Sequence, residues 1–124
     1  MKTKIKLALA QISSKRESKS KNLLKIEKLT LKAKQLGADL IIFPEMSLTG
    51  YVLLDQVYEL AETIPGPSTQ KIETLAKKID MHLIFGMPEL SENTQATIFN
   101  TAVFVGPQGL IGKYRKMYLP THSV

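Results

Sequence analysis

The sequence has 124 residues and no cysteine, so it suffices for one domain with a hydrophobic core but excludes disulfides, thiolate metal sites and a thiol nucleophile within this chain. Its composition, 44% hydrophobic and 23% charged, is that of a soluble globular protein, and no apolar run is long enough for a membrane span or a signal-peptide core. We therefore expect a cytoplasmic protein, whose net charge of +6 raises the question of an anionic partner.

Strand and helix patterns alternate along the chain. Residues 4–12 alternate between apolar and polar side chains, which predicts a strand, and a polar loop follows over 13–19. Apolar residues at helical spacing from Leu23 to Leu36 predict a helix that Gly37 can end. The elements expected in chain order are a strand over 4–12, a helix capped by Ser18 or Ser20 and ending near Leu36, a strand over 39–43, helices over 55–63 and from Pro67 to about Ile79, and strands over 81–85, 98–105 and 110–117.

This order predicts an α/β fold with one mixed sheet. Strand–helix alternation gives parallel strands, and the turn at Gly106–Gly109 suits a hairpin that adds an antiparallel edge. Loops are expected over 46–54 and 87–95. The strands at 39–43 and 81–85 are apolar on both sides, yet the helices suffice to cover only one face. A bare apolar sheet face predicts a partner or a missing segment.

The positive charge is concentrated near the N-terminus. Residues 1–34 hold 11 lysines and arginines against 2 acidic residues, whereas residues 35–124 hold 6 against 9. Such asymmetry can indicate a nucleic-acid surface, but most of these lysines interleave with the apolar stripe of one predicted helix, which is typical of a solvated helix face. Aromatic residues are only 6% of the chain and do not interleave with the lysines. We expect neither a nucleic-acid nor a membrane partner.

Glu45 and Lys116 are the first candidates for chemistry. Glu45 follows an apolar strand after a single proline, at the edge where α/β sheets usually place their sites. A charge at a buried strand end is costly, so a chemical role is the first explanation to consider. Lys116 lies at the end of the last predicted strand, and Tyr51 lies in the loop after Glu45. The two histidines, His82 and His122, are distant and lack clustered carboxylates, so we expect no metal site.

Several short motifs follow one another along the chain, and they are Phe43-Pro44-Glu45, Gly50-Tyr51, Ile64-Pro65-Gly66-Pro67, Asn100-Thr101-Ala102, Gly106-Pro107-Gln108-Gly109 and Gly112-Lys113-Tyr114-Arg115-Lys116. With these motifs the chain, from Ile5 to Val124, resembles the N-terminal half of a nitrilase-superfamily carbon–nitrogen hydrolase. The resemblance implies half of an α-β-β-α sandwich, one mixed sheet with helices on one face. It also implies a cofactor-free Glu–Lys–Cys triad that hydrolyses nonpeptide amide, carbamoyl or nitrile groups. Glu45 matches its glutamate, Lys116 its lysine, and Tyr51 a substrate-binding position.

The sequence also departs from this family. The family's cysteine lies well beyond the lysine, and a second glutamate common after the lysine is absent here. Tyr118 stands where many relatives have a histidine. Ser47 and Thr49 lie near Glu45, but loop hydroxyls are common, and we do not expect either to replace the thiol. We therefore expect residues 1–124 to be a single carbon–nitrogen hydrolase domain, truncated at the C-terminus and inactive alone.

Two other functions remain open. The chain could be a noncatalytic nitrilase-like subunit or remnant that binds a partner chain, or, as the least favoured hypothesis, a small basic nucleic-acid binder that uses residues 1–34. For the hydrolase, the resemblance implies a small-molecule amide or nitrile substrate once the missing half completes the site, and a homo-oligomer or complementing chain as partner.

Asn100 is expected to satisfy backbone groups between strands, and His82 to be structural.

Overall fold

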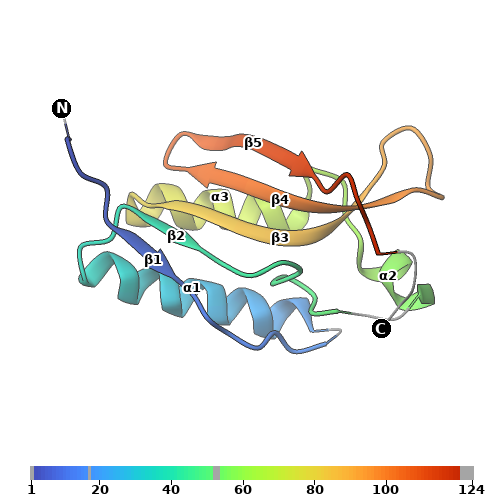
Figure 1. The fold of residues 1–124 in the computed structure, drawn as a ribbon, viewed down its shortest axis with the longest axis horizontal. Coiled ribbons are helices and arrows are strands. Elements are labelled where there is room, and N and C mark those ends of the chain that lie inside the picture. The colour runs from blue at the N-terminus through green and yellow to red at the C-terminus, as the bar shows by residue number, and fades with distance from the viewer. Residues whose placement is uncertain (1, 17, 52–53, 121–124) are drawn as a thin grey trace.

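The computed structural model describes residues 2–16, 18–51 and 54–120, apart from the side chain of Leu54. Within them the chain forms a five-stranded mixed sheet in the spatial order β1-β2-β3-β4-β5 (Figure 1). The first three strands are parallel, and β4 and β5 extend the sheet as antiparallel neighbours. The elements are β1 (Leu7–Leu9), α1 (Lys19–Gln35), β2 (Leu40–Ile42), α2 (Leu54–Leu60), α3 (Pro67–Ile79), β3 (His82–Leu90), β4 (Ile98–Gly106) and β5 (Gly109–Arg115). The predicted α/β class and element order are confirmed.

The two long helices begin and end close to the predicted residues. Ser18 occupies the N-cap of α1, although its hydroxyl makes no capping hydrogen bond, and Gly37 follows the helix at φ +82°, where a glycine costs least. α3 begins at Pro67, which needs no N–H at that position. The carboxylate of Glu62 accepts the Ser68 N–H at 2.7 Å in the first turn of α3.

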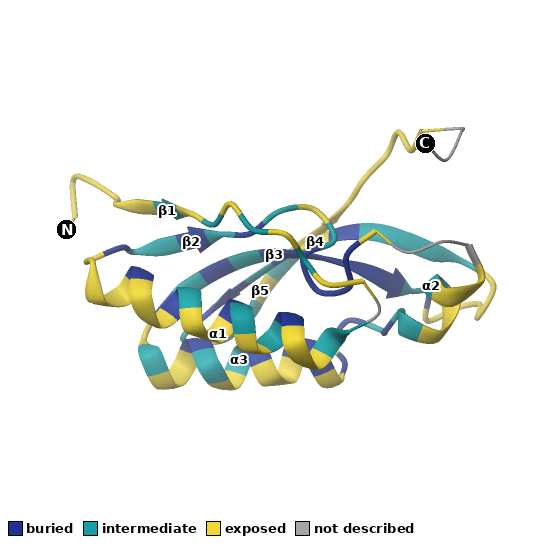
Figure 2. Cartoon of the chain, turned by 90° about the horizontal axis from the view of Figure 1, so that it is seen from below, coloured by how far each residue is buried: buried dark blue, intermediate teal, exposed yellow. Residues whose placement is uncertain are grey.

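The core lies between the sheet and the helices. Helices α1 and α3 cover one face of the sheet, and no described helix covers the other (Figure 2). Ile26 of α1 and Ile72 of α3 are buried against alternate residues of the strands. The buried strand residues of this core include Ile41, Leu83, Phe85, Val103 and Val105. Because side chains alternate across a strand, the residues between them point to the other face.

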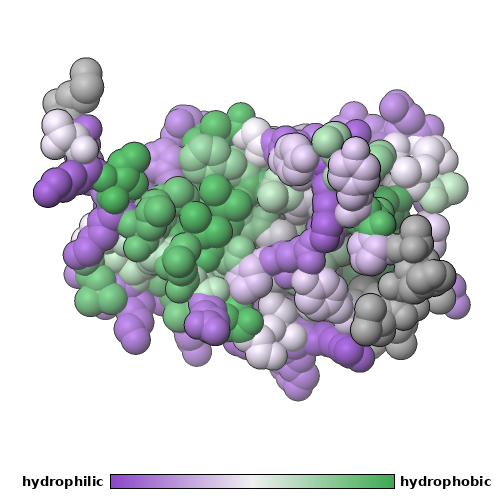
Figure 3. Space-filling view, viewed as in Figure 1, coloured by the Kyte–Doolittle hydropathy of each residue, from purple (hydrophilic) through white to green (hydrophobic). Residues whose placement is uncertain are grey.

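That other face is apolar and uncovered within the described residues, as the sequence predicts. Leu9, Ile42, Ile84 and Phe104 lie side by side across four strands, and Leu7 lies beside Leu40 in the neighbouring row. Leu7 is 53% exposed and Leu9 76%. Figure 3 shows apolar side chains gathered over this part of the sheet. We call this surface the bare face.

Two predicted boundaries were wrong for a shared reason. β3 continues to Leu90, so residues 87–90 are strand rather than loop, and α2 ends at Leu60 instead of residue 63. The chain after α2 pairs with this extension of β3, since the Leu90 N–H donates to the Glu62 carbonyl at 2.8 Å. Charged Glu89 made the segment look like a loop, yet its side chain is buried among polar partners.

Other predicted elements differ at their ends. β1 spans only Leu7–Leu9 of the expected 4–12. The ring of His82 lies 5.9 Å from that of Phe104, which fits its expected structural role, whereas His122 lies outside the described residues. Among the described helices, none is long and apolar enough to cross a bilayer.

We expect the bare face to make the 124-residue chain self-associate and bind a hydrophobic dye, because exposed apolar area of this kind favours contact. Leu7→Lys places a charge on that face and should reduce both effects, measured by sedimentation velocity and dye fluorescence. Leu24→Lys is the matched control, since Leu24 is similarly exposed at 55% but lies on α1. If the wild-type chain sediments as a monodisperse monomer and does not increase the fluorescence of the dye, the expectation is contradicted.

Candidate active site

Glu45 lies in the turn that follows β2. The Phe43 N–H donates to the Ile84 carbonyl at 2.8 Å, so the chain stays paired with β3 just beyond the end of β2. It then turns at Pro44, whose carbonyl accepts the Ser47 N–H at 3.2 Å. The turn places Glu45 at the carboxyl end of a parallel strand, the edge at which α/β sheets usually bind ligands.

Gly86 of β3 allows this turn to lie directly against the sheet. A Cβ at Gly86 would come 2.5 Å from the backbone N of Met46 and 3.0 Å from Cα of Glu45. The Gly86 N–H donates to the Ser47 hydroxyl at 3.1 Å, and the Gly86 carbonyl accepts the Leu48 N–H at 3.0 Å. The backbone that carries Glu45 is therefore fixed on β3 through one glycine.

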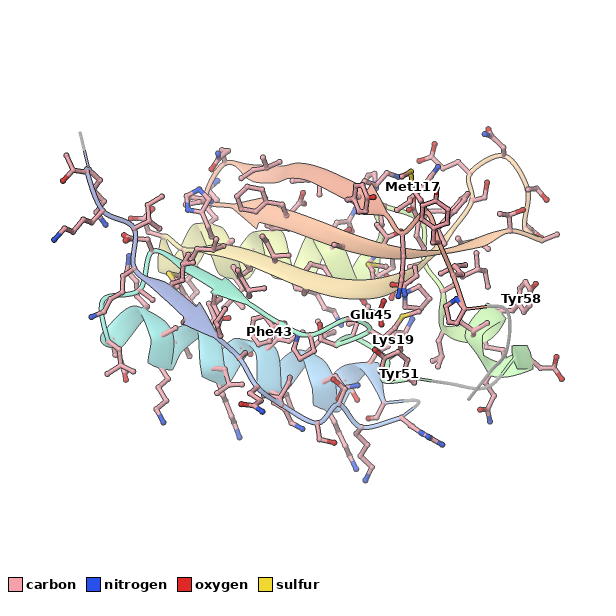
Figure 4. The ribbon with its side chains drawn as sticks, in the orientation of Figure 1. Lys19, Phe43, Glu45, Tyr51, Tyr58 and Met117 are labelled. Atoms are coloured by element: carbon pink, nitrogen blue, oxygen red, sulfur yellow. The ribbon has the colours of Figure 1, made fainter. Side chains whose placement is uncertain are left out.

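Three donors converge on the Glu45 carboxylate. Lys116 Nζ lies 2.8 Å and Asn100 Nδ2 2.7 Å from Oε1, and the Tyr51 hydroxyl donates to Oε2 at 2.5 Å. Figure 4 shows Glu45 and Tyr51 beside each other, below the end of β3. The fold thus brings together the three residues singled out in the sequence, Glu45, Lys116 and Tyr51, and adds Asn100.

The contacts make Glu45 a stable anion. The hydrogen bond from Lys116, followed by that from Tyr51, lowers the pKa of Glu45 below its ordinary value, because both stabilise the ionised form. The hydrogen bond that Tyr51 donates to Glu45 in turn raises the pKa of Tyr51. Glu45 is therefore ionised at neutral pH and can accept a proton.

Glu45 follows a buried strand, yet its own side chain and that of Lys116 are partly exposed. The exposed fractions of the side chains are 36% for Glu45 and 42% for Lys116. Both point toward the side of the sheet on which no described segment packs. A hollow of about 340 Å³ lies beside them, and its floor is the end of the bare face. The residues that line it include Ile42, Ile84, Ala102, Tyr114, Asn100 and Lys116.

Glu89 supports the strand that leads to Lys116. Its buried carboxylate contacts Lys113 and Arg115 on β5, with Arg115 Nη2 at 2.8 Å, and accepts the Thr101 hydroxyl at 2.8 Å. Burial by itself raises the pKa of Glu89, but the bonds from Arg115, Lys113 and Thr101 outweigh burial and hold it at about 2. This ion cluster fixes β5 one residue before Lys116.

Asn100 was expected to satisfy backbone groups with its side chain, yet that side chain contacts Glu45. The hydroxyls of Ser47 and Thr49 are buried and bonded to backbone groups, which fits a structural role. In the part of the chain that the structure describes, no three histidine, aspartate or glutamate residues gather as a metal site would require.

Comparison with known proteins places these observations in a family. The model of the family described as carbon–nitrogen hydrolase matches residues 6–124. The chain is 36% identical over 118 residues to a nitrilase of Pyrococcus abyssi, covering 93% of this chain and 44% of that protein. It is 35% identical over 118 residues to the omega-amidase NIT2 of Homo sapiens, covering 94% and 41%.

Solved structures show the same architecture. Saccharomyces cerevisiae Nit3, a member of the nitrilase superfamily, superposes with a TM-score of 0.78 at 30% identity, covering 92% of this chain and 44% of that one. An N-terminal amidase is similar in fold, with a TM-score of 0.76 at 24% identity, covering 94% and 29%. The chain thus has the fold of less than half of each of these proteins, and the predicted fold class is confirmed.

Gly86→Ala should destabilise the chain by about 1–3 kcal/mol, because the new methyl group must displace the backbone of the Glu45 turn. Urea unfolding at pH 7 measures the change. Gly112→Ala is the matched control, since Gly112 is also a strand glycine but has no atom within 4 Å of its added Cβ. Equal stability of the two variants would show that the turn does not depend on this close approach.

Glu89→Gln should cost about 3 kcal/mol at pH 7, since it removes the carboxylate that balances Lys113 and Arg115. A folded-state pKa of about 2, below the ordinary 4.5, adds stability that is complete above 4.5 and is lost as the pH falls toward 2. The difference between wild type and Glu89→Gln should therefore shrink below pH 4.5 in urea unfolding curves. Glu59→Gln, at an exposed position of α2, is the control. A difference that stays constant from pH 7 to pH 3 would contradict this account.

Proposed function

The chain belongs to the carbon–nitrogen hydrolase family, and we propose that it is the N-terminal part of an enzyme that hydrolyses nonpeptide amide, carbamoyl or nitrile C–N bonds. In this proposal residues 1–124 are one incomplete hydrolase domain. Glu45 is the general acid–base group, Lys116 stabilises the developing oxyanion, and Tyr51 binds at the substrate pocket. The substrate is a small-molecule amide or nitrile.

The observation that carries the proposal is the Glu45–Lys116 pair. Its partners are 71 positions apart in the sequence and lie 2.8 Å apart in space. An isolated surface ion pair contributes little to stability, so stability alone is a weak reason for this arrangement. Two further donors on the same carboxylate and a neighbouring hollow of about 340 Å³ are features of a site that binds and reacts.

The proposed chemistry follows from the two charges. Glu45 takes the proton of an incoming thiol, and the thiolate attacks the carbonyl carbon of an amide. Negative charge develops on the carbonyl oxygen, where the Lys116 ammonium stabilises it. Protonated Glu45 then passes its proton to the departing ammonia or amine, which leaves a thioester. Water, deprotonated by Glu45, hydrolyses the thioester and frees the thiol.

The thiol must come from outside these 124 residues, because they contain no cysteine. We propose that a second layer packs on the bare face and brings the cysteine to the exposed side of Glu45 and Lys116. This layer is either the remainder of a longer polypeptide, which would then assemble as a homo-oligomer, or a complementing chain. The same contact would cover the exposed leucines of β1 and withdraw Glu45 from water.

A noncatalytic role is the second candidate. The lack of a cysteine and the apolar bare face together favour a nitrilase-like subunit or remnant that binds a partner chain. In that case the partner would cover the bare face, and the Glu45–Lys116 pair would have no part in hydrolysis.

The intact mass of the protein from its source cells distinguishes the catalytic candidate from the noncatalytic one. A mass near twice 13.8 kDa means a longer enzyme, and a mass of 13.8 kDa means a subunit or remnant.

A chimera tests the catalytic roles directly. Residues 1–124 are joined to the part of the Pyrococcus abyssi nitrilase that follows its matched region, and ammonia release is measured on a panel of small amides and nitriles. We expect hydrolysis by the chimera and none by the 124-residue chain. Glu45→Gln should lower kcat by about 10²–10⁴-fold and Lys116→Met by about 10²–10³-fold.

The controls are Glu59→Gln and Lys28→Met, which remove an exposed charge of the same kind from each of two helices. Circular dichroism checks that every variant is folded. A chimera that hydrolyses its substrates equally well with Glu45→Gln would overturn the proposed roles. A folded chimera that is inactive on every substrate that the intact relative hydrolyses would favour the noncatalytic candidate.

A further inference from the structure

We propose that Asn100 is a positioning residue that locks Glu45 and Lys116 into one unit. Its backbone carbonyl accepts the N–H of Lys116 at 2.8 Å, and its side-chain Nδ2 donates to Glu45 Oε1 at 2.7 Å. One residue of β4 therefore bonds to the main chain of the lysine and to the side chain of the glutamate.

The place of Asn100 in the sheet suits this role. It lies on β4, opposite Pro88 of β3, and the Pro88 carbonyl faces away from β4, where it accepts the Glu62 N–H at 3.3 Å. The backbone partner of the Asn100 carbonyl comes instead from the other side, from Lys116 just after β5. This bond continues the β4–β5 pairing beyond Arg115 and determines where the lysine side chain starts.

The side chain of Asn100 holds the Glu45 carboxylate in a more closely defined position than the side chain of Lys116 does. The lysine reaches Glu45 through a flexible four-carbon stem and is 42% exposed, so its ammonium alone defines the carboxylate position loosely. Asn100 reaches the same oxygen through a short side chain on a paired strand. Together with the Tyr51 hydroxyl on Oε2, its amide holds both carboxylate oxygens and thereby fixes the rotation of the carboxylate.

The inference separates into two parts. The coupling between Asn100 and Glu45 is a property of this chain and can be measured without any activity. Its importance for hydrolysis rests on the proposed function, because only a reacting Glu45 needs a fixed orientation. Two groups of titratable residues lie near Glu45. Lys116 and Tyr114 line the same hollow as Glu45, and Tyr51 and Arg16 line a second hollow that Glu45 also borders.

The test is a pH titration of the full 124-residue chain by NMR, with ¹³C-labelled glutamate and ¹⁵N-labelled asparagine. The Glu45 carboxyl signal is assigned by its loss in Glu45→Gln. In the wild-type chain we expect the side-chain amide signal of Asn100 to shift with pH at the same midpoint as Glu45. A residue that merely fills space in the strand would not report that titration.

Variants give the direction of the coupling. In Asn100→Ala the carboxylate of Glu45 loses a hydrogen-bond donor, which should raise the midpoint pH of its titration. Asn100→Asp preserves the shape of the side chain but places a second carboxylate beside Glu45, which should raise this midpoint pH further. Asn93→Ala, in the exposed loop between β3 and β4, is the control and should leave it unchanged.

The results decide the two proposals separately. An Asn100 amide signal insensitive to the Glu45 titration, or a Glu45 midpoint unchanged in Asn100→Asp, overturns the positioning role whatever the chimera does. The expected order of midpoints establishes the coupling even if the chimera proves inactive. Should Asn100→Ala fail to fold, the wild-type amide titration and the isosteric Asn100→Asp still give the answer.

Discussion

A sheet that the described helices cover on one side only is the constraint on which the rest of this structure depends. Alternate residues of each strand enter the core beneath α1 and α3, and those between them form the bare face. Because Glu45 and Lys116 are presented at the end of this bare face, the proposed site is in contact with water. The same absence of a covering layer therefore accounts for both the exposed leucines of β1 and the exposed ion pair.

Electrostatic balance differs between the two carboxylates beside β4. Glu89 is buried, and its cationic partners and a hydroxyl compensate for burial so fully that its pKa is held at about 2. Glu45 has one cation, two neutral donors and open solvent. A layer packed over Glu45 would remove that solvent and raise the pKa of its carboxyl group toward the range in which a base is effective. Packing of a layer over Glu45 would therefore also change the strength of Glu45 as a base.

Much of the fold could be predicted from local pattern, because apolar spacing, Pro67 and Gly37 each specify a helix or its end. The extension of β3 through Glu89 could not, since burial of that charge depends on cations from a later strand. Within the candidate site, ordered motifs pointed to Glu45, Lys116 and Tyr51. The side-chain contact of Asn100 was missed because it joins residues 55 positions apart and depends on strand register.

The ion cluster around Glu89 has a consequence for synthesis of the chain. A nascent polypeptide that has emerged only as far as β4 carries the glutamate but neither Lys113 nor Arg115, and burying an unpaired carboxylate is costly. The sheet therefore gains its full stability only once β5 has paired. Lys116 is the next residue after that strand. The pairing of β5 and the synthesis of Lys116 thus coincide, so a chain cut short before β5 would lack both the cationic partners of Glu89 and the lysine of the candidate site.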